Sequence, residues 1–116
     1  MFVTRADTHK MVGSSKQGKM YITFDELVDM FGPPHYLYEN EEGEVPHKVR
    51  CEWDIEVDTP TGPVVFSIYD WCEYETPVRD VDRWSIGGHS VKAVQVFMEL
   101  KGLPLDLWEG KQDKRV

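Results

Sequence analysis

The sequence predicts an α+β domain in which an antiparallel β-meander of three to four strands carries two helices on one face. Three observations lead to this class: apolar and polar residues alternate from Val49 to Val57, a turn-rich segment follows at 58–63, and helical patterns flank the strands at 23–31 and 90–101. Strands that follow one another through tight turns pair antiparallel. The sequence lacks the strand–helix–strand alternation that would indicate a parallel sheet.

The chain has 116 residues and a formal net charge of −8. No run approaches the ~20 apolar residues needed to span a bilayer, and the first residues lack a basic start followed by an apolar core. The sequence therefore predicts a cytoplasmic protein without a membrane partner. Because nucleic-acid affinity depends on clusters of Lys and Arg, the acidic balance also argues against duplex nucleic acid as a partner.

The N-terminal part combines an irregular segment with a well-marked helix. Residues 1–19 show no sustained period, which predicts a flexible arm with a short strand at its start, and a single domain is expected over residues 20–108. Thr23 and Glu26 have the spacing of a capping box at a helix start. Gly32, followed by two prolines, is predicted to end this helix.

The hairpin pairs Val49–Val57 with Val64–Trp71. The first arm has one apolar face, whereas the second arm is apolar on both faces and is therefore predicted to be an interior strand. A third strand is expected at Arg83–Ile86, with Trp84 and Ile86 on one face. The turn between the two arms contains two prolines and a glycine, which fixes their antiparallel pairing.

The second helix is predicted to run from its cap at Ser90 to Lys101, and Gly102 closes it. Its apolar positions form one broad face, which is typical of a helix packed on a sheet. Residues 109–116 are charged and are predicted to be a frayed tail.

A pair of glycines, Gly87 and Gly88, immediately precedes the second helix. Glycines let backbone N–H groups approach a ligand closely, and the free donors of a first helical turn favour phosphate or carboxylate. Arg83, Arg79 or Lys92 would add positive charge. The favoured interpretation is that the glycines only permit a tight strand-to-helix turn, and the ligand site is the alternative. The residues of the predicted ligand site are Gly87, Gly88, His89, Ser90, Arg83, Trp84, Tyr69 and Asp70.

Asp70 shares a strand face with Phe66 and Ile68, so its carboxylate needs partners if that face is buried. The indole of Trp84, a helix-start N–H or an arginine such as Arg83 would supply them. The favoured interpretation is a structural acceptor. A catalytic base is the alternative, because buried carboxylates are where shifted pKa values occur.

The cysteines and histidines do not indicate a metal site. Cys51 and Cys72 are predicted to be free thiols, with Cys51 packed inward. Structural zinc sites bring their ligands in close pairs, and no such pair is formed by His47, Cys51, Cys72 and His89. No metal or other cofactor is predicted.

Glu52, Asp54 and Glu56 alternate along the outer face of the first hairpin arm. Such a face is ordinarily solvated, and the alternative is that it docks on a basic groove of a partner protein. Four Trp and five Tyr in a small chain also allow an aromatic interface between identical copies.

Two resemblances add to these patterns. The run from Ile22 through Phe31-Gly32-Pro33-Pro34, followed by a tryptophan-bearing strand, resembles the opening of BamE/SmpA and β-lactamase-inhibitor-like folds. The runs Phe66–Trp71 and Trp84–Ser90 are similar to small uncharacterised proteins of tailed phages. The second resemblance implies a nonstructural accessory protein that acts in the host cytoplasm, and it implies no reaction.

The sequence thus leads to three functional hypotheses. The first is a nonenzymatic accessory binding protein of phage type, which sequesters a phosphate-bearing nucleotide or metabolite at Gly87–Gly88 and so antagonises host defence. The second is an acidic protein that inhibits a host or defence enzyme by docking Glu52, Asp54 and Glu56 on it. The third is a small hydrolase that uses Asp70 and His89.

Overall fold

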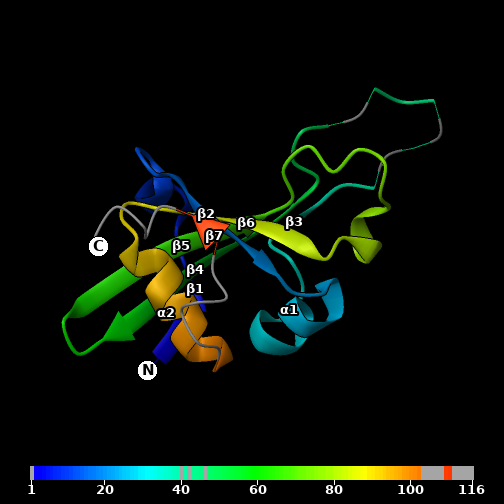
Figure 1. Cartoon of the computed structure of the whole chain (residues 1–116). Helices are drawn as coiled ribbons and strands as arrows, with labels where there is room; N and C mark the ends of the chain where they lie inside the picture. The colour runs from blue at the N-terminus through cyan, green and yellow to red at the C-terminus, as the bar shows by residue number, and fades with distance from the viewer. Residues whose placement is uncertain (1, 40, 42, 46, 103–108, 111–116) are drawn as a thin grey trace.

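Seven strands form one antiparallel sheet in the order β1-β4-β5-β6-β2-β7, and the short β3 pairs with β4 (Figure 1). The structure is a computed structural model that describes residues 2–39, 41, 43–45, 47–102 and 109–110. The strands are β1 (Phe2–Arg5), β2 (Ser15–Tyr21), β3 (Tyr36–Leu37), β4 (Cys51–Thr59), β5 (Gly62–Tyr69), β6 (Arg83–Gly88) and β7 (Glu109–Gly110). The helices are α1 (Phe24–Phe31) and α2 (Lys92–Lys101), and two 3-10 turns are η1 (Thr8–Met11) and η2 (Val78–Asp80).

Both helices pack on the same face of the sheet, which confirms the predicted α+β class (Figure 1). In α1, the ring of Phe24 lies 5.7 Å from that of Trp53 on β4. In α2, the ring of Phe97 lies 6.0 Å from that of Phe66 on β5. Trp53 and Phe66 are fully buried, as expected for rings that dominate the free energy of a small core.

The predicted hairpin is β4–β5, with Trp53 opposite Ile68 and Ile55 opposite Phe66. Its strands end two residues closer to the turn than predicted, because Thr59 and Gly62 still pair. β5 lies between β4 and β6, so its prediction as an interior strand is confirmed.

The sheet has more strands than the three to four predicted, mainly because residues 1–19 contain β1, which matches the short strand expected at the start, and most of β2. β1 pairs with β4 and β2 pairs with β6, so the first two strands lie on opposite sides of the hairpin. The register of β2 shifts between Lys16 and Gly18. This irregularity interrupts the alternation by which a strand is recognised in a sequence.

α1 has both predicted ends, and α2 ends as predicted, but the N-cap of α2 is Val91 rather than the predicted Ser90. At α1, Thr23 and Glu26 form the complete capping box, and Gly32 has a φ of 80°. α2 begins at Lys92, whose N–H donates to Ser90 Oγ at 3.2 Å, and its C-cap Gly102 has a φ of 75°. A left-handed residue at this position is the usual reason for glycine at a helix end.

The predicted tail lies mostly outside the described residues. Glu109 and Gly110 form β7 opposite Lys19 and Gly18, so this part of the tail belongs to the sheet. Among the described residues, no helix has the length and apolarity needed to cross a membrane.

Candidate anion-binding pocket

Two buried charged residues meet where β4 begins and β5 ends. Asp70 is fully buried, and its carboxylate accepts hydrogen bonds from the backbone N–H groups of Arg50 and Cys51, both at 2.8 Å. Arg50 Nε donates to the same carboxylate at 3.0 Å, and Arg50 Nη2 donates to the carbonyl of Glu73 at 2.8 Å. Three donors satisfy the Asp70 carboxylate, as a buried charge requires. The Arg50 guanidinium is thereby fixed in one orientation.

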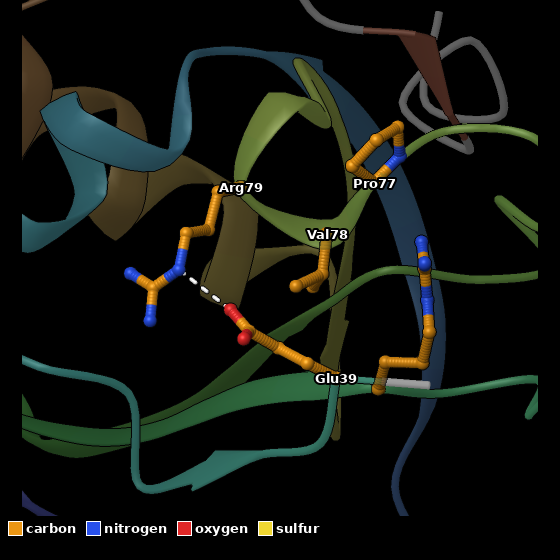
Figure 2. Close-up of a pocket in the computed structure, with 5 residues that line it drawn as sticks. Glu39, Pro77, Val78 and Arg79 are labelled. Carbon is orange, nitrogen blue, oxygen red and sulfur yellow. Dashed lines mark hydrogen bonds and ion pairs between the residues drawn. The ribbon is translucent and has the colours of Figure 1, made fainter. Parts of the chain in front are cut away.

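Arg50 lines a pocket of about 270 Å³ together with Glu39, Pro77, Val78 and Arg79. We call this set the arginine pocket. Figure 2 shows the side chains of Arg79 and Glu39 directed toward one another, with Val78 and Pro77 on the neighbouring wall. The pocket thus combines two guanidinium groups with an apolar wall from η2.

The guanidinium of Arg50 keeps hydrogen-bonding capacity. Its Nη1 has no hydrogen-bond partner within the part of the chain that the structure describes. This atom is also open to solvent, because the unpartnered side-chain atoms that are sealed from solvent belong to other residues. An arginine donates five N–H bonds in a planar fork that matches carboxylate and phosphate. Arg50 therefore offers a rigid donor group to the pocket it lines.

Arg79, in contrast, is held loosely. Its Nε donates to Glu39 Oε1 at 2.6 Å, but the two side chains are 59% and 53% exposed. The guanidinium carbon also lies 5.4 Å from the centre of the Phe24 ring, a favourable cation–π distance. The Phe24 contact keeps Arg79 at the pocket, while the exposed ion pair with Glu39 is weak.

The double-glycine corner, residues 87–90, is built for close packing. A Cβ on Gly88 would lie 2.5 Å from Ala93 Cβ, and a Cβ on Gly87 would lie 2.6 Å from Ser67 Oγ. Both glycines are buried. Both glycines belong to β6, and the chain turns only after them. Gly88 lets α2 pack close to the strand end, as the favoured tight strand-to-helix turn requires, whereas Gly87 makes room for Ser67 and Tyr69 on β5.

The first turn of α2 has already used the donors that were predicted to bind an anion. The N–H groups of Lys92 and Ala93 donate to Ser90 Oγ and to the Ser90 carbonyl, and that of Val94 donates to the Val91 carbonyl. A pocket of about 190 Å³ lies beside the corner, lined by Pro63, Val64, Val65, His89, Ser90, Lys92 and Ala93. In it, Lys92 Nζ is bonded to Thr61 Oγ1 at 2.6 Å.

Of the remaining residues of the predicted ligand site, Tyr69 lies beside Gly87, where an added Cβ would be 3.2 Å from its Cε1, whereas Trp84, Arg83 and Asp70 lie elsewhere. Trp84 is buried on the helix-covered face, where its indole donates to the Val81 carbonyl at 3.2 Å. Tyr69 lies on the opposite face, and Arg83 lies at the far end of β6, 5.7 Å from the Tyr21 ring. Arg79, expected to add charge to the corner, lines the arginine pocket instead.

Asp70 and His89 are also apart. Since Phe66 pairs with Gly88, His89 follows β6 beside Val65, and Asp70 lies five residues further along β5. At 3.4 Å per residue this separates them by about 17 Å along the strand pair. His89 Nε2 contacts the Lys10 carbonyl at 2.7 Å. The structure does not bring the two proposed hydrolase residues together.

The acidic face of β4 is only partly solvated. Glu56 is paired with Lys10 Nζ at 2.6 Å, whereas Asp54 is 5% exposed and its Oδ1 has no hydrogen-bond partner within the described ranges. Burial, followed by the neighbouring Asp54 carboxyl, raises the pKa of Glu52 to about 8. Glu52 and Asp54 thus form a carboxyl pair that holds a proton at neutral pH.

The thiols have the predicted state. Cys51 and Cys72 are free, and Cys51 is fully buried. Burial raises the pKa of Cys51 to about 12, which keeps this thiol protonated and unreactive. Among the described residues, no three His, Cys, Asp or Glu side chains gather where they would hold a metal ion.

Sequence reasoning missed Arg50 and Glu39 as site residues. The sequence did contain a signal for Arg50. Asp70 was expected to need an arginine, and the predicted turn places Asp70 opposite Cys51, which directly follows Arg50. Comparisons with protein-family models, curated proteins and solved structures give no match. Fold and site together define a small α+β domain with an arginine-lined pocket at one end of its central hairpin.

Proposed function

We propose that this protein is a nonenzymatic binding protein whose ligand is a small phosphate-bearing metabolite or nucleotide held in the arginine pocket. The observation that carries the proposal is the fixed Arg50 guanidinium, whose side chain is 7% exposed and lines a pocket of about 270 Å³. Its Nη1 has no hydrogen-bond partner in the described part of the chain. The ligand class is the one that the sequence predicts at the double-glycine corner. The arginine pocket supports it with donors that are still available.

The geometry suits an anion with several oxygens. A phosphate can accept from Arg50 on one side and from Arg79 on the other, since both residues line the same pocket. Charge-assisted hydrogen bonds of this kind contribute about 1.5–3 kcal/mol each. Pro77 and Val78 provide an apolar wall for the uncharged part of the ligand.

Glu39 is paired with Arg79 in the free protein, so a carboxylate fits beside this guanidinium. Because both side chains are more than half exposed, the free energy of this ion pair is about 0–1 kcal/mol. An incoming phosphate therefore displaces Glu39 at little cost. The side chain of Glu39 acts as a weak internal competitor.

The volume limits the ligand. Sites for drug-sized molecules occupy roughly 300–1,000 Å³, so a pocket of about 270 Å³ holds one phosphate group with a ring or short chain attached. Sequestration of such a ligand would suit the phage accessory role, antagonistic to host defence, that the tailed-phage resemblance implies. That role is part of the proposal and rests on the sequence alone.

Isothermal titration calorimetry tests the proposal, with pyrophosphate, inorganic phosphate and ADP titrated into the protein. We expect binding of at least one of them, weakened about tenfold or more in Arg79→Gln, because one charge-assisted contact is lost. Arg79 is exposed, so this variant should keep its fold, which circular dichroism can verify.

Lys92→Gln is the matched control, because Lys92 lines the pocket beside the double-glycine corner. This variant removes the same charge and should bind within about twofold of the original protein. Absence of binding for all three probes would overturn the proposal. A loss in Lys92→Gln with none in Arg79→Gln would move the site to the corner.

A further inference from the structure

The open face, which is the face of the sheet opposite the helices, carries a row of side chains across four strands. Tyr36 pairs with Glu52, Glu52 with Tyr69, and Tyr69 with Ser85. Directly paired residues have side chains on the same face, with Cβ atoms about 4.5–5.5 Å apart. Glu52 therefore lies between two tyrosine rings.

Among the described residues, no lysine or arginine forms an ion pair with the carboxyl pair of Glu52 and Asp54. Asp54 lies two residues further along β4 on the same face and is 5% exposed. Its Oδ1 is sealed from solvent and has no hydrogen-bond partner in the described part of the chain. The charged neighbours that act on Glu52 are Asp54 and Asp70, and both carry the same sign as Glu52. A buried carboxylate without a partner is unusual, because burial of an uncompensated charge is unfavourable.

Aromatic side chains surround the carboxyl pair and remain accessible. Tyr36 is 44% exposed and Trp71 is 42% exposed. The Trp71 ring meets the Tyr69 ring edge-on, with centroids 6.5 Å apart. Lys48 Nζ already lies 5.8 Å from the centre of the Trp71 ring, which shows that this ring accepts a cation.

From this arrangement we infer a second binding site, in which Glu52 receives an arginine or lysine side chain from a basic segment of a partner protein, flanked by Tyr36 and Tyr69. The cationic head would compensate Glu52 directly and Asp54 beneath it. The stem of the same side chain would pack on the aromatic rings, as long basic side chains do. The net charge of −8 favours the approach of a basic partner.

Neighbouring residues on the open face restrict the site to this end of β4. Glu56, on the same face of the same strand, is already paired with Lys10 at 2.6 Å. Lys10 belongs to η1, in the connection from β1 to β2. The sequence suggested Glu52, Asp54 and Glu56 as a docking face. The structure reduces this face to Glu52 and Asp54 with the neighbouring aromatic side chains.

A peptide of alternating arginine and glycine is the probe, and the same peptide with uncharged citrulline in place of arginine is its control. Binding is followed by calorimetry and by the fluorescence of Trp71, which is exposed whereas Trp53 and Trp84 are fully buried. We expect the arginine peptide to bind and the citrulline peptide to bind at least tenfold more weakly. Equal binding of the two peptides would overturn the inference.

Glu52→Gln and Glu56→Gln separate a defined site from general attraction, since each replaces one carboxyl group on the same strand face with an amide. We expect about tenfold weaker binding in Glu52→Gln and a change within about twofold in Glu56→Gln. Equal effects of the two variants would show that only net charge matters, which contradicts the inference. Arg79→Gln should leave peptide binding unchanged, so this test is independent of the arginine pocket.

Discussion

The arginine pocket and the double-glycine corner both place positive charge beside a hollow, and they differ in which donors are already used. At the corner, the first amides of α2 donate to Ser90 and Val91, and Lys92 donates to Thr61. At the arginine pocket, two contacts fix Arg50 while Nη1 stays unpaired among the described residues. Availability of donors, rather than their chemical type, distinguishes a candidate site from a packed turn.

The largest expected effect concerns the residue that holds Arg50 in place. Asp70→Asn leaves a buried guanidinium without its counter-charge, and we expect the free energy of unfolding to fall by about 3 kcal/mol. Urea denaturation measures this. The matched variant is Asp54→Asn, at a site with 5% exposure where Oδ1 has no hydrogen-bond partner among the residues that the structure describes. It should change stability by less than about 0.5 kcal/mol or increase it. Equal losses would contradict the distinction between the two aspartates.

Gly88→Ala tests whether the double-glycine corner is a packing device. The added Cβ would lie 2.5 Å from Ala93 Cβ, so we expect a loss of about 1–3 kcal/mol from overpacking. Thermal denaturation provides the measurement. Pyrophosphate affinity should stay unchanged in the folded variant. The double variant Gly88→Ala/Ala93→Gly should recover part of the loss, less the ~1 kcal/mol that glycine costs within a helix. No recovery would argue against this contact.

The carboxyl pair of Glu52 and Asp54 is a third region to compare, because neither carboxyl group has an ion-pair partner among the described residues. The pKa of Glu52 is raised to about 8 from 4.5, so between these pH values the unfolded chain has released a proton that the fold retains. Stability therefore falls as the pH rises through this interval, and the loss is complete above about pH 8. Glu52→Gln should remove the dependence and stabilise the protein by about 1 kcal/mol above pH 8, after discount for partial exposure.

Denaturation of the original protein and of Glu52→Gln at pH 5 and pH 9 measures this difference. The two proteins should be closest in stability at the lower pH. A constant difference across the range would show that Glu52 titrates normally.

The smallest expected effect is on ligand affinity. Glu39→Gln removes the carboxylate that competes for Arg79, and pyrophosphate should bind about two- to fivefold more tightly, since an exposed ion pair is worth less than about 1 kcal/mol. Calorimetry detects such a change. Glu41→Gln, in the same loop, is the charge-matched control and should have less effect. Equal gains would indicate a general electrostatic change.

Several elements were predictable because their signals are local. The capping box of α1 and the alternation of β4 depend on residues a few positions apart, and the turn residues fix the β4–β5 register. That register places Asp70 opposite Cys51, so its partner Arg50 was within reach of the sequence. β1 corresponds to the short strand expected at the start of the chain. β2 and β7 were not predictable, because short or bulged strands are completed by distant partners.

The candidate site was harder to predict than the fold. Glycines before a helix are visible in a sequence, but whether Ser90 already occupies the helix donors depends on how the corner folds. Glu39, Arg50 and Arg79 come from three separate segments, and only the assembled sheet brings them to one pocket. The same holds for the row of Tyr36, Glu52 and Tyr69 on the open face.

The most direct test is a nuclear magnetic resonance titration of the isotope-labelled protein with pyrophosphate. We predict that the Nε–H signals of Arg50 and Arg79 shift progressively, while the backbone amides of Lys92, Ala93 and Val94 stay in place. Shifts confined to those amides, with both arginine signals unchanged, would contradict the arginine pocket as the binding site.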